Sequence, residues 1–299
     1  MLSGYIYYSL TTMQPVINRY TQEGTYTLNS LALNNGRSIP GIGFGTWQIT
    51  PSSNAKEMVL AALKAGYRHI DTAKIYGNED GVGEAIRESG IPRHELFITT
   101  KLWNDDQGYD RTLKACTESI KKLGVDYLDL YLIHWPATKK RHDSWRAMEK
   151  LVAAGMIKAG GVSNYTAEHV DQLLERSEMV PAVNQVEFHP FIYEQQQAVL
   201  NYCHEKGIVI EAYSPISRVS SDAGKPIKDI ADRLGTTPQQ VGLRWCLQHN
   251  TVPMPRSTNI DHIESNFQIY DFELSAKDMK TLNSLSDGQR VTWDPAGMG

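Results

Sequence analysis

The sequence predicts an α/β protein of the (β/α)8 TIM-barrel class, with an N-terminal β-hairpin and a C-terminal tail over the barrel mouth. Eight short apolar segments alternate with eight amphipathic segments of helical length between residues 42 and 267. Gly66, Gly124, Gly155 and Gly207 each follow a helical segment and precede an apolar one, as expected at helix C-terminal ends. The 299 residues, 41% hydrophobic and 21% charged, suit one large globular domain.

The apolar segments are assigned as strands and the amphipathic segments as helices. The strands are expected at Ile42–Gly45, His69–Asp71, Phe97–Thr100, Leu128–His134, Ala159–Val162, Ala182–Glu187, Val209–Tyr213 and Val252–Pro255. The helices are expected at Ala55–Ala65, Asp80–Glu88, Asp110–Leu123, Ser144–Ala154, Ala167–Arg176, Gln195–Glu205, Pro226–Leu234 with Pro238–His249, and Asp261–Phe267. Before them, Tyr26–Leu33 and Arg37–Pro40 flank an Asn-Gly turn and predict the hairpin.

A doubly wound sheet is the alternative fold. It is disfavoured because no GxGxxG segment follows the first strand. Gly41, Gly43 and Gly45 are close together, but a tryptophan and a polar loop follow them instead of a tight turn into a helix. We interpret these glycines as positions of close packing at the barrel mouth.

Residues 1–24 are expected to form an N-terminal extension that is disordered or not native, and residues 25–299 a single domain. The extension is polar and rich in tyrosine. It lacks the basic segment and small-residue cleavage pattern of a secretory signal.

Charge and cysteine content exclude several functional classes. A net charge of −4 gives no reason to expect nucleic acid or an anionic membrane as a partner, and no apolar run is long enough to span a bilayer. The three cysteines, Cys116, Cys203 and Cys246, form no CxxC pair and predict free thiols in a reducing compartment. We therefore expect a cytoplasmic protein, acting as a monomer on a small molecule.

Polar side chains gather at the predicted strand ends, which is where barrel active sites form. Asp71 ends the second strand with Tyr76 just beyond it, Lys101 follows the third strand, and His134 ends the fourth. His134 has the same side-chain parity as Leu128, Leu130 and Leu132, so it should face the barrel interior. Taken singly, each of the four polar residues is more often a helix cap, a surface charge, a structural histidine or a packed aromatic.

Together, the four residues predict proton transfer to a carbonyl oxygen. A tyrosine at its ordinary pKa is a weak acid at neutral pH, a nearby cation lowers that pKa, and a carboxylate holds the cation. A lysine at the barrel mouth is costly to bury unless it is paired, and Asp71 is the expected partner.

Several long segments, in fixed order, resemble the aldo-keto reductase family, and within it the microbial diketogluconate-reductase and aldehyde-reductase branch. The resemblance begins at about Thr27 and continues to the C-terminus. The matching segments are Gly66–Ala73 with Tyr76, Glu79 and Gly83, then Phe97–Trp103, Leu130–Pro136, Gly161–Tyr165 and Pro255–Ser257. The resemblance implies that Tyr76 is the general acid, Lys101 lowers its pKa, Asp71 holds Lys101, and His134 orients the carbonyl.

The same resemblance implies an extended nicotinamide cofactor, NADPH, bound across the barrel mouth without a Rossmann fold. Ser163, Asn164 and Gln185 would hold the carboxamide and Tyr213 would stack on the ring. The remaining residues implied in cofactor binding are Ser214, Pro215, Arg256, Ser257, Thr258, His262 and Asn266. Independently of the family, Arg256 lies between a strand and a helix N-terminus, a position that suits a phosphate.

Two departures from the family pattern concern the choice of cofactor. His262 stands where relatives commonly carry an arginine beside the adenosine 2′-phosphate, and Ser265 stands where many carry a glutamate next to Asn266. A neutral imidazole holds a phosphate less well than a guanidinium. We therefore expect NADPH to bind through Arg256 and NADH to be accepted as well.

Trp47, Trp103 and Trp135 follow the first, third and fourth strands and predict a flat apolar wall for the substrate. The substrates expected are aldehydes, ketones, dicarbonyls, keto sugars or keto acids. Two rival functions remain open. One is a non-catalytic NADP(H)-binding or structural barrel. The other is metal-dependent hydrolysis, for which His189 and Glu187 are close in sequence but have no further ligand set of metal-like spacing.

Overall fold

The computed structural model describes residues 29–136 and 139–298. A hairpin of β1 (Ser30–Ala32) and β2 (Ser38–Pro40) precedes an eight-stranded parallel sheet in the order β10-β9-β8-β7-β6-β5-β4-β3. Its strands are β3 (Phe44–Gly45), β4 (His69–Asp71), β5 (Phe97–Leu102), β6 (Leu128–Ile133), β7 (Ile157–Ser163), β8 (Val183–Glu187), β9 (Val209–Tyr213) and β10 (Thr251–Met254). Backbone hydrogen bonds from Gly43 to Pro253 (3.1 Å) and from Gly45 to Pro255 (2.9 Å) join the two edges. The barrel prediction is therefore confirmed.

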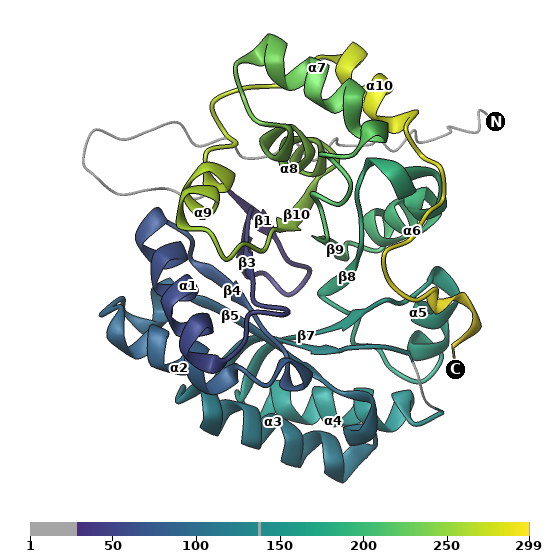
Figure 1. Ribbon diagram of the computed structural model, residues 1–299. Helices are drawn as coiled ribbons and strands as arrows, with labels where there is room; N and C mark the ends of the chain where they lie inside the picture. Colours follow the sequence, from purple (N-terminus) through teal and green to yellow (C-terminus); the bar gives the residue numbers. More distant parts are fainter. Residues whose placement is uncertain (1–28, 137–138, 299) are drawn as a thin grey trace, which may run out of the picture.

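Helices surround the strands on the outside of the barrel (Figure 1). They are α1 (Ser52–Ala65), α2 (Glu79–Glu88), α3 (Tyr109–Leu123), α4 (Arg141–Ala153), α5 (Ala167–Leu174), α6 (Tyr193–Glu205), α7 (Lys225–Leu234), α8 (Pro238–Gln248), α9 (Ile260–Phe267) and α10 (Ala276–Asn283). Helix α10 was not predicted, because its eight residues carry few apolar side chains and bury only Leu282 among them. No helix within the described residues is long and apolar enough to cross a membrane.

The hairpin closes the N-terminal end of the barrel. Its turn is held by a hydrogen bond from the Gly36 amide to the Leu33 carbonyl (3.1 Å), and Gly36 has a φ of +80°, which glycine adopts at little cost. Leu33 and Ile39 pack in one buried cluster with Phe97 and Val183, the first residues of β5 and β8. The hairpin prediction is confirmed from residue 29 onward. Its first residues, Tyr26–Leu28, and the extension at residues 1–24 lie outside the described part of the chain.

Side chains alternate along β6 as the sequence predicted. Leu130 and Leu132 belong to the interior cluster, whereas Tyr131 and Ile133 pack with the outer cluster beneath the helices. Leu128, which the alternation also assigned to the interior, packs with the outer cluster at the start of the strand. The interior row of Leu130 and Leu132 leads directly to His134 at the mouth.

Close packing is present at Gly43, but it lies beside His69 at the start of β4, inside the barrel, and not at the mouth as predicted. A Cβ atom there would lie 2.5 Å from the Met254 Cε and 2.8 Å from the His69 Nδ1. Gly43 therefore makes room for the side chain of His69 inside the barrel.

Gly83 provides a test of the packing between α2 and α3. A Cβ atom at this position would lie 2.4 Å from the Leu123 carbonyl oxygen, which is backbone and cannot rotate away. Helix propensity alone predicts that Gly83→Ala stabilises the protein by about 1 kcal/mol. We expect the opposite sign, a loss of about 1–3 kcal/mol, because the two helices must separate. Urea unfolding measures the change, with exposed Glu84→Ala on the same helix as a control expected to stay within about 0.5 kcal/mol.

Candidate active site

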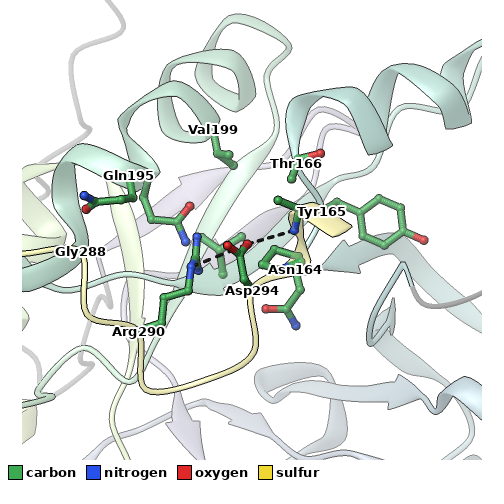
Figure 2. Close-up of a pocket in the computed structure, with 12 residues that line it drawn as sticks. Asn164, Tyr165, Thr166, Gln195, Val199, Gly288, Arg290 and Asp294 are labelled. Atoms are coloured by element: carbon green, nitrogen blue, oxygen red, sulfur yellow. Dashed lines mark hydrogen bonds and ion pairs between the residues drawn. The ribbon is translucent and has the colours of Figure 1, made fainter. Parts of the chain in front are cut away.

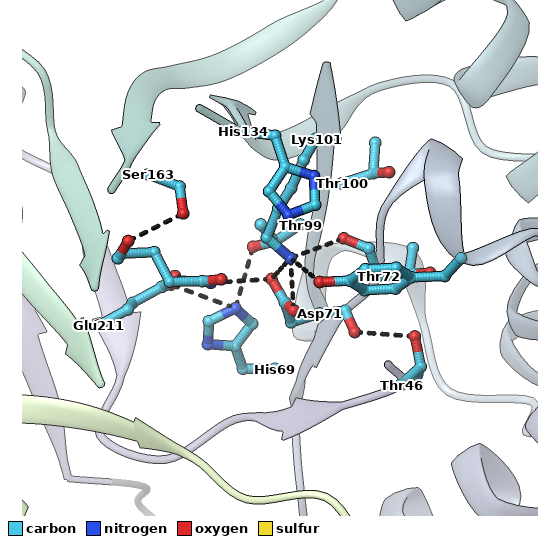
Figure 3. A network of polar contacts seen from close by, with 12 residues as sticks. Thr46, His69, Asp71, Thr72, Thr99, Thr100, Lys101, His134, Ser163 and Glu211 are labelled. Carbon is cyan, nitrogen blue, oxygen red and sulfur yellow. Dashed lines mark hydrogen bonds and ion pairs between the residues drawn. The ribbon is translucent and has the colours of Figure 1, made fainter. Parts of the chain in front are cut away.

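The buried ammonium of Lys101 is the centre of the site (Figure 3). Lys101 lies on β5 and has an exposed fraction of 0%. Its Nζ donates to both carboxylate oxygens of Asp71 (2.6 and 2.8 Å), to the Thr72 carbonyl (2.9 Å) and to the Tyr76 hydroxyl (3.3 Å). The pairing of Lys101 with Asp71, expected from the sequence, is thus present in the structure.

The chain between β4 and α2 brings Tyr76 back over Lys101. A 3₁₀ turn at Lys74–Tyr76 ends at Gly77, whose φ of +67° reverses the chain. The buried Asn78 then fixes this segment by donating to the carbonyls of Thr46 and Ile49 and accepting from the Thr72 hydroxyl. Tyr76 is therefore held by a hydrogen-bonded loop as well as by Lys101.

His134 immediately follows β6 and faces Tyr76 across the mouth. Its ring lies 5.8 Å from the Tyr76 ring and 5.3 Å from the Trp103 ring, centroid to centroid. Burial and the charge of Lys101 hold the pKa of His134 well below its ordinary value, so the imidazole is neutral at physiological pH. Its Nδ1 is buried and has no hydrogen-bond partner among the described residues.

Burial and charge act in opposite directions on Tyr76 and Lys101. Burial raises the pKa of the Tyr76 hydroxyl, and the positive charge of Lys101 acts to lower it but does not prevail. Burial acts to lower the pKa of Lys101, yet Asp71 and Tyr76 more than compensate, so the pKa is raised and the ammonium stays charged. The predicted effect of Lys101 on Tyr76 is present as one contribution, while the net pKa shift of Tyr76 is upward.

A pocket of about 610 Å³ opens directly above Tyr76 and His134. The three predicted tryptophans line it: Trp47 is 48% exposed at the rim, and Trp135 is buried. Trp293 from the C-terminal tail lies 5.4 Å from Trp135, centroid to centroid, and also lines the pocket. The prediction that the tail covers the mouth is therefore confirmed.

The predicted cofactor residues fall into two groups. Seven of them line the same pocket: Ser163, Asn164, Gln185, Tyr213, Ser214, Pro215 and Arg256. The other four are not among its lining residues: Ser257 and Thr258 precede α9, His262 lies in its first turn, and Asn266 lies in its last turn.

At the inner end of the pocket, the predicted carboxamide residues are bonded to one another and to the catalytic segment. Asn164 donates to the His134 carbonyl (3.0 Å) and accepts from the Tyr213 hydroxyl (2.8 Å). The Ser163 hydroxyl donates to the Gln185 carbonyl (2.8 Å). These bonds fix a set of amide and hydroxyl groups beside an aromatic ring, which suits a flat heteroaromatic amide such as nicotinamide.

At the outer end, Arg256 is exposed and donates to the Gln48 side chain (3.3 Å). Helix α9 begins nearby, with Asn259 capping it by accepting from the His262 amide (3.3 Å). An arginine and a helix N-terminus together favour phosphate. The pocket thus has an aromatic amide-binding end and a cationic end, and its residues fit a dinucleotide.

Glu187, at the end of β8, holds the C-terminal tail, and no pattern in the sequence predicted this contact. Its carboxylate accepts from the Val291 amide (2.8 Å), the Thr292 amide (3.3 Å) and the Thr292 hydroxyl (2.6 Å). His189 also contacts it at 2.9 Å. The two residues considered as metal ligands are thus bonded to each other, and Glu187 is also bonded to the tail. The Thr292 hydroxyl also lies 2.7 Å from that of Tyr213, which connects the tail to the cofactor side.

A second cavity, of about 390 Å³, lies behind the tail (Figure 2). Arg290 and Asp294 of the tail form a long ion pair of 3.9 Å at its wall, opposite Gln195 of α6. Asn164 lines both cavities. Tyr76 and His134 line the first pocket but not this cavity. The cavity therefore lies outside the reaction site.

Comparison with known proteins identifies the family. The model described as Aldo/keto reductase family matches residues 41–287, which include all eight barrel strands. The chain belongs to the aldo-keto reductase family.

This aldo-keto reductase is 46% identical to the glyoxal reductase of Bacillus subtilis over 267 residues, covering 89% of this chain and 96% of that protein. The crystal structure of an aldo/keto reductase from Brucella melitensis aligns with a TM-score of 0.83 and 44% identity, over 87% of this chain and 100% of the other. That of a Bombyx mori aldo-keto reductase in complex with NADP aligns with a TM-score of 0.82 and 33% identity, over 88% and 94%. The chain is therefore one of a family of oxidoreductases that reduce carbonyl compounds.

The hold of Glu187 on the tail is open to a direct test. Burial acts to raise the pKa of Glu187, but hydrogen bonds from His189, Thr292 and Val291 outweigh it and hold the pKa below its ordinary value. A depressed carboxyl pKa means that the anchor is present above the unfolded-state pKa and is lost as pH falls through the folded-state value.

We expect Glu187→Gln to loosen the tail at neutral pH, because an amide offers one acceptor oxygen where the carboxylate offers two. The protection factors for hydrogen exchange at the Val291 and Thr292 amides should fall by about tenfold or more, and those of the wild-type protein should approach the same low values only in acid. Exchange at barrel amides such as Leu132 serves as the internal control. Unchanged exchange in the tail of the variant would show that Glu187 is not the anchor.

Proposed function

We propose that this protein is an NADPH-dependent carbonyl reductase in which Tyr76 is the general acid. The observation that carries the proposal is the position of the Lys101 ammonium, bonded to Asp71 and 3.3 Å from the Tyr76 hydroxyl at the floor of the pocket. The neutral ring of His134 faces the same hydroxyl-bearing ring. An acid, a cation that stabilises its conjugate base, and a neutral hydrogen-bonding group therefore converge on one place.

In the proposed reaction, a carbonyl group lies in the pocket with its oxygen between Tyr76 and His134. The imidazole of His134 orients that oxygen by a hydrogen bond. The reduced nicotinamide, when bound, supplies a hydride to the carbonyl carbon. Tyr76 gives its proton to the oxygen, and the phenolate that remains is stabilised by Lys101, which Asp71 holds in place.

For the cofactor, Tyr213 would stack on the nicotinamide ring, while Ser163, Asn164 and Gln185 would hold the carboxamide. Ser214 and Pro215 would shape the loop over the pyrophosphate. Arg256, Ser257 and Thr258 would bind phosphate with the N-terminal end of α9, flanked by His262 and Asn266. The fit of the pocket to an aromatic amide at one end and an anion at the other supports this assignment.

The proposed substrates are aldehydes, ketones or dicarbonyls, with keto sugars and keto acids included. The glyoxal reductase activity named for the Bacillus subtilis relative supports a dicarbonyl. The tryptophans at the rim support apolar or planar groups beside the carbonyl. We further propose that the protein acts as a monomer in the cytoplasm.

Replacing Tyr76 tests the acid. We expect Tyr76→Phe to lower kcat for carbonyl reduction by at least about 100-fold, because general acid catalysis contributes that much or more, with little change in NADPH affinity. The assay is NADPH oxidation over a panel of carbonyl compounds, with cofactor affinity followed by quenching of tryptophan fluorescence. Tyr202→Phe, which removes a hydroxyl bonded to Asp171 outside the pocket, is the matched control. Undiminished turnover by Tyr76→Phe would refute the assigned acid.

The position of His262 predicts weak discrimination between cofactors. With an imidazole in place of a guanidinium, we expect NADPH to be preferred over NADH through Arg256, but by less than about a thousandfold, or about 4 kcal/mol. The ratio of kcat/KM for the two cofactors measures this preference. We expect His262→Arg to increase it, whereas a larger preference than a thousandfold in the wild type would contradict the hypothesis.

A further inference from the structure

A second buried carboxyl group lies next to the Lys101–Asp71 pair. Glu211, on β9, has an exposed fraction of 0%. The side-chain amide of Gln185 donates one hydrogen bond to Asp71 Oδ2 (3.0 Å) and another to Glu211 Oε2 (2.5 Å). One amide group therefore bridges Asp71, which holds Lys101, and Glu211, which is not among the residues that line the pocket (Figure 3).

The other oxygen of Glu211 has no donor. Glu211 Oε1 has no hydrogen-bond partner among the described residues and lies 3.6 Å from His69 Nε2. His69 is equally buried, and its Nε2 is 2.9 Å from the Thr99 hydroxyl. A buried carboxylate oxygen without a donor costs far more free energy than a buried neutral carboxyl group. The arrangement therefore favours a neutral Glu211 beside a single ammonium that is already paired.

The proton affinities agree with this geometry. Burial and the charge of Asp71 raise the pKa of Glu211 to about 8, against the opposing effects of Gln185 and Lys101. Burial and the charge of Lys101 lower the pKa of His69 to about 3, so His69 is neutral and supplies no positive charge. Near neutral pH, Glu211 thus holds a proton that it loses in mildly alkaline solution.

We propose that Glu211 is a positioning residue for carbonyl reduction, which fixes the amide of Gln185 against Asp71 and sets, by its own charge, the acidity of Tyr76. The inference rests on the proposed function of Tyr76 and Lys101. Both amide hydrogens of Gln185 are occupied by carboxyl oxygens, so its carbonyl oxygen is the part left to accept from a ligand in the pocket.

The effect of Glu211 on the acidity of Tyr76 follows from the sign of its charge. With Glu211 neutral, the pair of Lys101 and Asp71 has no net charge, and Lys101 can stabilise the phenolate that Tyr76 becomes. Ionised Glu211 adds a negative charge to the same buried group, which opposes phenolate formation. Reduction should therefore slow as pH rises through the ionisation of Glu211.

Few other titratable groups near Glu211 could cause the same decrease in activity at alkaline pH. The titratable groups that face Glu211 are Asp71 and His69 on β4 and Lys101 on β5. From β8, Glu211 meets only the neutral amide of Gln185. The pKa of Lys101 is raised from its ordinary value and that of His69 is low. The pKa of Tyr76 is raised from its ordinary value of 10.0.

The test is the pH dependence of kcat/KM for carbonyl reduction with saturating NADPH, from pH 6 to 10. We expect kcat/KM of the wild type to fall on the order of tenfold as the pH rises through about 8, as one added charge in a buried site implies. Glu211→Gln, which mimics the neutral acid, should not show this decrease. Glu79→Gln is the matched control. Glu79 is also buried, but it accepts from Thr100 and has no contact with Lys101 or Gln185. It should keep the wild-type profile.

A second measurement does not depend on turnover. Infrared difference spectroscopy of the intact protein should show a protonated carboxyl band that disappears through pH 8 in the wild type and in Glu79→Gln, and that is absent from Glu211→Gln. A wild type that carries this band but has no reductase activity would refute the proposed function and leave the protonation of Glu211 established. An active wild type without the band, or a Glu211→Gln variant that keeps the decrease in kcat/KM at alkaline pH, would overturn the inference about Glu211.

Discussion

The rest of the site depends on one buried ion pair, between Lys101 and Asp71. Removing an ammonium from water costs several kcal/mol, which only a close carboxylate and further hydrogen bonds offset. Asp71 and the Thr72 carbonyl provide them at 2.6–2.9 Å. Because the partners lie on neighbouring strands, with Asp71 opposite Thr99 in the register, the pairing requires that β4 and β5 align as they do. Asn78 bonds to Thr72, directly after β4, and so anchors the loop that carries Tyr76. The position of the proposed acid is therefore tied to the position of the cation.

Two glutamates on adjacent strands show how the environment divides residues of one type into different functions. Glu187 meets four donors from the tail and His189, so it is stable as an anion and anchors the cover of the pocket. Glu211 meets one amide, another carboxyl and a neutral imidazole, so it is stable as an acid. One contributes a fixed charge at the edge of the mouth, and the other a removable proton inside the barrel.

Much of the fold was predictable from the sequence, because apolar periodicity and the glycines after helices reflect local forces. The residues at the strand ends were predictable for the same reason: in a barrel, the parity along β6 requires His134 to continue the row of Leu130 and Leu132 into the mouth. Contacts between distant segments were not predictable. Glu211 reads as an ordinary strand residue, the bonds of Glu187 to Val291 span 104 positions, and the eight residues of α10 have too weak an apolar pattern. These features depend on tertiary packing, which no local pattern specifies.

The upward shift in the pKa of Tyr76 bears on the proposed proton transfer. A cation beside a phenol is usually taken to make it more acidic, yet here burial prevails over Lys101 and Tyr76 remains protonated at neutral pH. A protonated phenol is ready to act as an acid toward the alkoxide that forms as a carbonyl is reduced, and an alkoxide is a much stronger base than a phenolate. To act as a base on an alcohol, the same group would first have to lose its proton, which burial opposes. With Glu211 neutral, Lys101 would stabilise the phenolate that remains once the proton has been transferred, as the proposed reduction requires.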